Sequence, residues 1–247
     1  MRKRLHRNDR AAFAAFAATA RALGRSPSDY HAHAQAEARD RFGGAHELAP
    51  HERRGIEFAA RHIAPGQSCL VAGCGAGAEI AALRALGVED LRGLEISPVL
   101  AAACAQRFGI DAIVGDMAAP PLPARGVDVV LTHRSLHHML HPYQALEALA
   151  ACARHTLIVA DEPVRSAIKR ARDLLRGDRL VGDDASWEYQ FEPDMLIRHM
   201  GYAGFEPVDA IRYWETTRPG NDAVANAFIG RLGNRLTCVF RRLPGLS

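Results

Sequence analysis

The feature that most constrains this chain is a short hydrophobic run that leads into three glycines at alternate positions. Residues 69–72 are apolar, Gly73, Gly75 and Gly77 follow, and a helix-forming stretch begins at Ala78. Glycine is needed where the backbone turns tightly and lies against a ligand without a Cβ in the way. The pattern predicts a strand, a ligand-binding loop and a helix, but the loop alone does not decide whether the ligand is a dinucleotide.

The alternation of short apolar runs with helical stretches around this loop predicts an α/β fold. We expect a doubly wound, seven-stranded, mostly parallel sheet with crossover helices. The last two strands, at 205–214 and 236–240, are joined without a crossover helix, which predicts an antiparallel edge strand. The other strands are expected at 68–72, 91–96, 111–114, 127–132 and 155–160, and helices at 50–63, 78–86, 98–108, 143–154 and 193–200.

Two segments exceed what such a sheet needs. Residues 1–50 are expected to form an N-terminal helical lid, and residues 51–247 the sheet domain, with a helical insert at 161–192 after the fifth strand. The insert carries an apolar stripe beside a basic one, at helical spacing. Such a stripe suits an anionic or carrier-bound substrate, although a solvated face that only covers the sheet is the simpler interpretation. The basic stripe consists of Arg165, Lys169, Arg172 and Arg176.

Composition and charge exclude several classes of protein. The 247 residues contain 31 basic and 28 acidic side chains, a net charge of +3, which argues against a nucleic-acid partner. No window reaches the roughly 18 uncharged apolar residues of a membrane span. The five cysteines include no Cys-x-x-Cys pair and most lie in apolar runs, which predicts a cytoplasmic protein with buried thiols. The excess of alanine and arginine suggests a bacterial source.

Acidic residues follow the next two predicted strands. Glu95 lies 18 residues beyond Gly77, at the end of the second strand, where a carboxylate can accept both hydroxyls of a ribose. Asp116 follows the third strand and can accept a hydrogen bond from an adenine amino group, while Met117 can pack on the ring.

Together these elements resemble the class I S-adenosylmethionine-dependent methyltransferases. The 127–139 segment, with its Leu-His-His ending, is similar to the fourth strand of that family. Ala72 departs from the family, which usually has an acidic residue there that orders the loop and the methionine end of the cofactor. We therefore expect a weaker hold on that end. The resemblance implies S-adenosylmethionine as cofactor, bound by Gly73, Cys74, Gly75, Gly77, Glu95, Ile96, Asp116, Met117, His133 and, from the lid, Tyr30.

The resemblance implies a methyltransferase that acts on a small molecule, most simply at an oxygen. Because the sulfonium is already a strong electrophile, catalysis is mainly alignment and desolvation, and no catalytic triad is required. Two alternatives use the same site differently. One is an enzyme that transfers the aminocarboxypropyl group or catalyses a cyclisation, with release of methylthioadenosine. The other is a non-catalytic cofactor-binding module, suggested by Ala72.

The candidates for a general base are His137, His138 and Asp161, with Glu162 beside the last. An imidazole suits proton abstraction at neutral pH, and His137 is preferred. No metal is expected at the histidine cluster, because no cysteine or carboxylate lies near it in sequence. Four aromatic residues could line a wall around the sulfonium, through cation–π attraction. These are Trp187, Tyr189, Phe191 and Trp214.

Overall fold

The computed structural model describes residues 48–165, 189–215 and 232–245, together with six positions between residues 14 and 24. Most of the expected lid, Tyr30 included, lies outside the described residues. The same holds for 166–188 of the expected insert, which contains Trp187 and three of the four basic-stripe residues.

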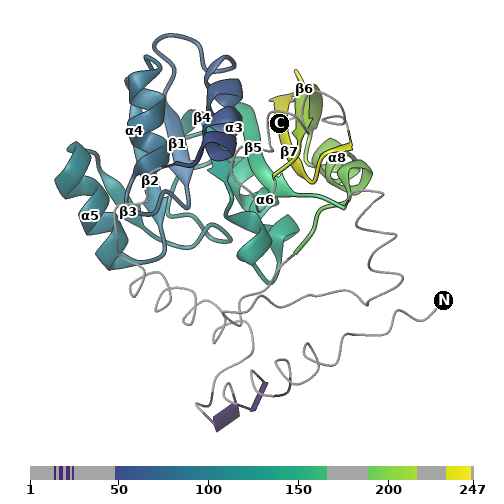
Figure 1. The fold of residues 1–247 in the computed structure, drawn as a ribbon, viewed down its shortest axis with the longest axis horizontal. Helices are drawn as coiled ribbons and strands as arrows, with labels where there is room; N and C mark the ends of the chain where they lie inside the picture. The colour runs from purple at the N-terminus through teal and green to yellow at the C-terminus, as the bar shows by residue number, and fades with distance from the viewer. Residues whose placement is uncertain are drawn as a thin grey trace.

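The described chain forms one seven-stranded sheet in the order β3-β2-β1-β4-β5-β7-β6 (Figure 1). Strands β1 to β5 run parallel, and β7 pairs antiparallel with both β5 and β6. The mixed, mostly parallel sheet was predicted, and the structure adds that β7 lies between β5 and the outermost strand β6. The strands are β1 (Cys69–Ala72), β2 (Leu91–Glu95), β3 (Ala112–Val114), β4 (Val127–His133), β5 (Ala153–Pro163), β6 (Phe205–Tyr213) and β7 (Arg235–Arg242).

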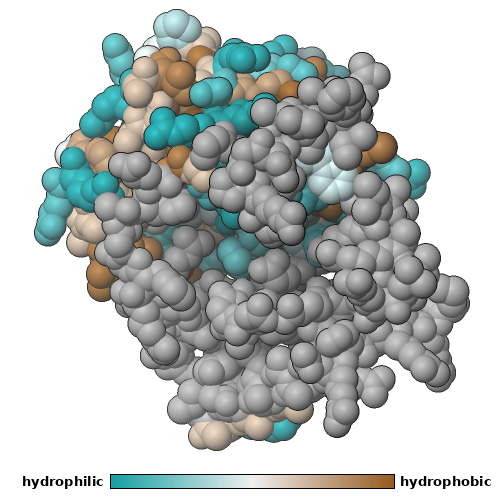
Figure 2. Space-filling view, in the orientation of Figure 1, coloured by the Kyte–Doolittle hydropathy of each residue, from teal (hydrophilic) through white to brown (hydrophobic). Residues whose placement is uncertain are grey.

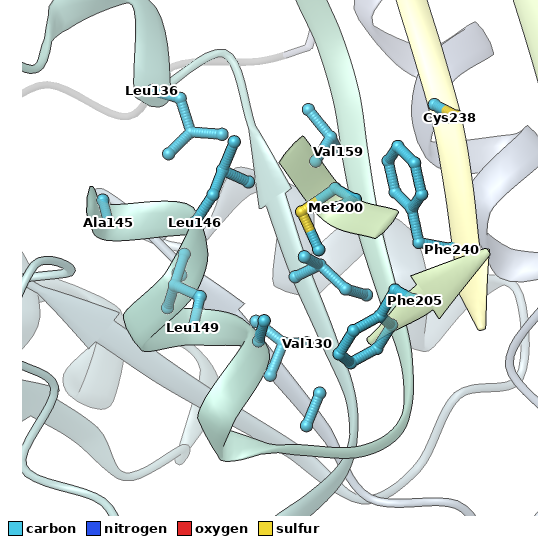
Figure 3. Packing of buried hydrophobic residues seen from close by; sticks show 14 of the residues in the cluster. Val130, Leu136, Ala145, Leu146, Leu149, Val159, Met200, Phe205, Cys238 and Phe240 are labelled. Carbon is cyan, nitrogen blue, oxygen red and sulfur yellow. The ribbon is translucent and has the colours of Figure 1, made fainter. Parts of the chain in front are cut away.

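Helices cover both faces of this sheet (Figure 1). On one face, α3, α4 and α5 pack on alternate residues of the parallel strands, with Ile56, Leu83 and Cys104 fully buried. On the other face, α6 and α8 do the same, with Leu146 and Met200 fully buried (Figure 3). The helices are α3 (Pro50–Ala60), α4 (Ala78–Ala85), α5 (Pro98–Phe108), α6 (Pro142–Cys152) and α8 (Pro193–Tyr202), with a short 3-10 helix, η1 (Leu136–His138).

The main boundary difference lies at the fifth strand. The predicted helix to residue 154 ends at Cys152, and β5 begins at Ala153 and continues to Pro163. Pairing with β4 on one side and β7 on the other extends the strand beyond its apolar run. Asp161 and Glu162 therefore belong to the sheet rather than to the start of an insert.

In the space-filling view the hydrophobic areas outside the grey atoms are small and separated by hydrophilic ones (Figure 2). All five cysteines are buried and free, as their sequence context predicted. None of the helices in the described ranges is long and apolar enough to cross a membrane.

Candidate active site at the carboxyl edge of the sheet

The glycine loop connects β1 to α4 and takes backbone conformations that only glycine adopts easily. Gly73 has φ 74° and Gly77 has φ 92°. A Cβ at Gly73 would lie 2.4 Å from Ser135 Oγ, and one at Gly77 would lie 2.6 Å from Phe108 Cδ2. The loop is thus packed between the end of β4 and helix α5, and its glycines serve close approach as well as turning.

Glu95 holds this loop against the end of β2. The residue is 2% exposed, and its Oε2 accepts a hydrogen bond from the Gly75 N–H at 2.8 Å. Its Oε1 accepts from the Ser97 N–H at 3.1 Å. A carboxylate oxygen can accept more than one hydrogen bond, so both oxygens keep acceptor capacity for a ribose.

The segment after β3 lies against the same loop. The Gly115 N–H donates to the Glu95 carbonyl at 3.0 Å, and Asp116 Oδ1 accepts from the Ala118 N–H at 2.8 Å. Met117 Cε lies 3.6 Å from the position that a Cβ on Gly73 would occupy. The structure therefore brings together the three elements that the sequence placed after successive strands.

His133 ends β4, and its side chain is almost completely buried. Its Nδ1 lies 3.1 Å from Glu79 Oε1, in the first turn of α4, and its Nε2 lies 3.9 Å from Asp161 Oδ2. Burial favours the neutral imidazole, but the hydrogen bond and charge of Glu79, with the charge of Asp161, outweigh it and raise the pKa of His133. Glu79 thus places a carboxylate behind the glycine loop, whereas Ala72 offers none.

Asp161 is the centre of a buried ion-pair network. Its Oδ1 accepts from the Tyr213 hydroxyl at 2.7 Å and its Oδ2 from Arg134 Nη1 at 3.1 Å. Arg134 also pairs with Glu52 and Glu215. Arg134 and Asp161 both have positive φ, at 49° and 53°, directly beyond the last residues that β4 and β5 pair with each other. Non-glycine residues held in this region are strained and gather at functional sites.

Glu162 and His137 form a second buried pair. Glu162 Oε2 lies 2.7 Å from His137 Nδ1, and Oε1 accepts from the N–H groups of Ser135 and Leu136, each at 2.9 Å. Burial alone would raise the pKa of Glu162, but the His137 side chain and these amides outweigh it and hold the pKa at about 2. Because the carboxylate is ionised, it orients His137 with Nδ1–H toward it and leaves Nε2 as the basic nitrogen.

The Glu162 pair predicts a specific loss of stability in acid. The pKa falls from its ordinary value of 4.5 to about 2 in the folded protein, so the carboxylate stabilises the fold above pH 4.5 and loses this effect as the pH falls toward 2. We expect Glu162→Gln to lower the free energy of unfolding by on the order of 3 kcal/mol at pH 7. Urea titrations should show the difference from wild type reduced by about 2 kcal/mol at pH 3. A pH-independent difference would contradict this account.

Ser135 joins this pair to the glycine loop. Its hydroxyl donates to the His133 carbonyl at 2.8 Å and lies 3.5 Å from the Gly73 carbonyl, while its N–H binds Glu162. The parallel strands β1, β2, β4 and β5 end at the same edge of the sheet, where open α/β sheets bind ligands. Gly73, Glu95 and the His137–Glu162 pair therefore belong to one site.

The other site residues predicted from the sequence lie in different environments. His138 stacks on His137, with ring centroids 4.0 Å apart. Both carboxylate oxygens of Asp161 accept hydrogen bonds, from Tyr213 and Arg134, which makes Asp161 a poorer candidate for the base than His137. Cys74 is fully buried beside Gly93, where it packs under the loop. Ile96, half-buried, follows Glu95 at the turn into α5.

The proposed aromatic wall is wrong for Phe191. That side chain is fully buried and packs edge-on against Tyr143, with ring centroids 5.8 Å apart, in the core between α6 and the sheet. Tyr189 contacts both of these rings, and its N–H donates to the His137 carbonyl at 2.8 Å. In the described part of the chain, no group of three or more histidine, cysteine or acidic residues could hold a metal ion.

Sequence reasoning missed Glu79 and Arg134. Glu79 lies two residues beyond Gly77, in the first helical turn, and Arg134 follows His133 directly. Their positions in the sequence could have identified both residues. Side chains at the start of α4 and at the end of β4 meet at the same edge of the sheet. Which carboxylate would meet which histidine depends on the pairing of strands far apart in sequence.

Comparison with known proteins agrees with this geometry. Residues 70–160 match a family model described as a methyltransferase domain. A search of curated protein sequences finds no relative of this chain.

Several solved structures share the fold. A magnesium protoporphyrin IX methyltransferase from Synechocystis PCC 6803 with bound SAH is 16% identical, covering 82% of this chain and 91% of that one, with a TM-score of 0.58. The 1,6-didemethyltoxoflavin-N1-methyltransferase from Burkholderia thailandensis is 20% identical, covering 78% and 79%, with a TM-score of 0.58. The cyclase SpnF is 19% identical, covering 78% and 81%, with a TM-score of 0.59.

At these identities the similar structures show the fold alone. The family model adds that residues 70–160 resemble a methyltransferase domain. The matched residues run from β1 to β5 and contain the glycine loop, Glu95, Asp116 and the Leu-His-His ending. Residues 70–160 therefore match a methyltransferase domain, and the seven-stranded sheet around them has the fold of solved methyltransferases.

Proposed function

We propose that this protein methylates an oxygen of a small-molecule substrate, with S-adenosylmethionine bound at the glycine loop and His137 as general base. The observation that carries the proposal is the short path from the loop to the base. Ser135 contacts Gly73 and Glu162, and Glu162 binds His137. A base held this close to the cofactor loop can reach a nucleophile aligned with the methyl group.

The residues at the loop fit the cofactor. Gly73 lets the loop lie directly against Ser135, Glu95 offers acceptor oxygens for the ribose, and Asp116 keeps Oδ2 for an adenine amino group. The paired His133 and Glu79 provide a carboxylate near the expected methionine end, in place of the acid that Ala72 lacks. Gly75, Gly77, Cys74, Ile96 and Met117 complete the proposed binding surface, and Tyr30 remains a proposal from the lid.

When bound, the cofactor supplies an electrophilic methyl group on a sulfonium. His137 Nε2 would accept the proton of the substrate hydroxyl, so that the oxygen becomes nucleophilic toward this methyl group. Glu162 holds the Nδ1–H and balances the charge of the imidazolium that forms. The buried carboxylates at this edge also favour a cation in the site.

The charge of this edge supports a small-molecule substrate. Its described residues include many carboxylates, which would repel the phosphates of a nucleic acid. Arg165, the one residue of the predicted basic stripe within the described ranges, lies 3.9 Å from Glu192. An anionic or carrier-bound substrate stays a prediction that rests on the rest of that stripe. The carboxylates are Glu52, Glu79, Glu95, Asp116, Asp161, Glu162 and Glu215.

Mass spectrometry of the spent cofactor tests the reaction class. Incubation with S-adenosylmethionine and a panel of small phenols and alcohols should give S-adenosylhomocysteine and a product 14 mass units heavier, about the mass of a methylene group. The same fold is found in the cyclase SpnF, so the product must be identified. Methylthioadenosine would favour aminocarboxypropyl transfer or cyclisation. An unconsumed but bound cofactor would favour a binding module.

Loss of one acceptor should weaken cofactor binding measurably. We expect Glu95→Gln and Asp116→Asn each to raise the Kd for S-adenosylmethionine by about tenfold, since each replaces a charged acceptor of a ligand hydrogen bond. Calorimetric titration measures the change, with Asp90→Asn, an exposed carboxylate before β2, as the control. Unchanged binding in both variants would contradict the site assignment.

A further inference from the structure

A cavity lies at the opposite edge of the sheet from the glycine loop. It has a volume of about 720 Å³ and is bounded by the end of α3, the first residues of β5, the end of β7 and the turn that follows it. Because β1, β4 and β5 are parallel, their amino ends meet here, and their carboxyl ends form the active site. The cavity is therefore separate from the cofactor site.

The wall of this cavity is basic. Two histidines, His62 and His155, accompany five arginines, and no carboxylate contributes to the lining. In contrast, the described part of the active-site edge is rich in carboxylates. The net charge of the whole chain is near neutral, yet these two edges of the sheet carry charges of opposite sign. The five arginines are Arg61, Arg125, Arg154, Arg241 and Arg242.

Nearby carboxylates neutralise only part of this charge. Asp128 pairs with Arg154 and lies 3.7 Å from His155, and Asp209 lies 3.1 Å from His62. Glu206 is opposite Arg241 in the pairing of β6 with β7. Even with these three carboxylates ionised, the arginines leave a net positive charge.

Arg125 and Arg242 both line the cavity, and their like charges oppose each other. Arg242 donates to the carbonyls of Ala150 and Ala153, at 2.6 and 2.8 Å, and lies over the Phe205 ring at 4.5 Å. Burial, followed by the charge of Arg125, lowers the pKa of Arg242. Like charges fixed at short range destabilise one another, and an anion between them would remove that cost.

Arg61 and Arg241 are exposed at the cavity and form no ion pair with any residue that the structure describes. Their side chains are therefore available to a ligand. Arginine is well suited to this role, because its planar guanidinium donates two parallel hydrogen bonds to a phosphate.

We propose that this cavity binds a small anion that carries two or more phosphate groups. Several guanidinium groups on one concave wall match several phosphates better than one. The volume lies in the range of small-molecule sites. The turn at Leu243–Gly245 forms part of the wall.

Calorimetric titration with inorganic tripolyphosphate tests the proposal on the full-length protein. We expect one site per chain and binding weakened at least about tenfold in the double variant Arg61→Gln/Arg241→Gln, which removes two charge-assisted contacts. The matched control is Arg92→Gln/Arg198→Gln, which removes the same charge from exposed arginines outside the cavity. The control should bind tripolyphosphate within about twofold of wild type, and both double variants should keep the wild-type Kd for S-adenosylmethionine.

Three results would overturn the proposal. They are absence of tripolyphosphate binding at millimolar concentration, equal weakening in the two double variants, and sulfate binding as tight as tripolyphosphate at matched ionic strength. The second and third would indicate general screening of charge. Tighter binding of single-stranded RNA or of an acidic peptide, with the same dependence on Arg61 and Arg241, would also contradict a small-anion site, because the occupant would be a macromolecule.

Discussion

Replacement of His137 by asparagine is expected to lower kcat for methyl transfer by about 10²–10⁴-fold, the usual contribution of a general base. Asparagine can donate an amide hydrogen to Glu162 from nearly the position of Nδ1, so the buried carboxylate keeps a partner. It has no nitrogen that can accept a proton at neutral pH. The Kd for S-adenosylmethionine should stay within about twofold of wild type, because His137 does not hold the glycine loop.

His138→Asn is the matched control for this experiment. The two rings stack 4.0 Å apart, but Glu162 binds His137 alone. We expect the His138 variant to lose much less activity. Equal losses of activity in the two variants would contradict the role of His137 as the base.

Gly73→Ala is expected to have the largest effect on the cofactor site. The new Cβ would lie 2.4 Å from Ser135 Oγ and 2.8 Å from Ser135 Cβ, at a backbone φ of 74° that alanine adopts with strain. The two costs together should lower the free energy of unfolding by about 2–4 kcal/mol. Since Ser135 links the loop to Glu162, its displacement should also raise the Kd for S-adenosylmethionine by at least about tenfold.

Gly66→Ala separates these two costs. Gly66 has a similar φ of 80°, and a Cβ there would meet nothing within 4 Å. Only the backbone strain should therefore lower the free energy of unfolding of this variant, by about 1 kcal/mol, and it should bind the cofactor as wild type does. Urea denaturation and calorimetry measure both quantities. If Gly73→Ala is no worse than Gly66→Ala, the close packing of the loop against Ser135 is not what the site depends on.

The sequence was sufficient for the sheet and for the residues that follow its strands. The order of residues along the chain is enough to recognise a strand that ends in glycines and acids that follow the next two strands. Parallel pairing then brings Gly73, Glu95 and Asp116 to one edge whatever the rest of the fold does. The mostly parallel sheet and the buried free cysteines are confirmed for the same reason, since both depend on short apolar runs.

Partnerships between side chains were not predictable in this way. Asp161 and Glu162 are adjacent in sequence and both buried, yet one pairs with Arg134 and Tyr213 and the other with His137. Asp161 lies at an irregularity in the pairing of β5 with β7, beyond the last residue that β5 pairs with β4. The simple alternation of side chains between the two faces of a strand therefore does not predict which acid meets the histidine. Sequence alone had left both as equal candidates.

The arginine cavity shows the same limit. Its lining comes from four segments separated by as many as 180 residues or so, and no single segment has enough charge to stand out. The basic stripe that did stand out, at residues 165–176, is contiguous in sequence. A pattern of neighbouring residues can be recognised in the sequence. A cluster of charges that forms only when β5 pairs with β7 cannot.

Photochemical cross-linking of radiolabelled S-adenosylmethionine, followed by mapping of tryptic peptides, tests most directly that the cofactor binds at the glycine loop. The loop, Glu95 and Asp116 fall in the peptides 62–84, 93–107 and 108–125. We expect label in one or more of these peptides, and its loss when excess S-adenosylhomocysteine is present. Label found only elsewhere in the chain, or label that the competitor does not displace, would contradict the proposed site.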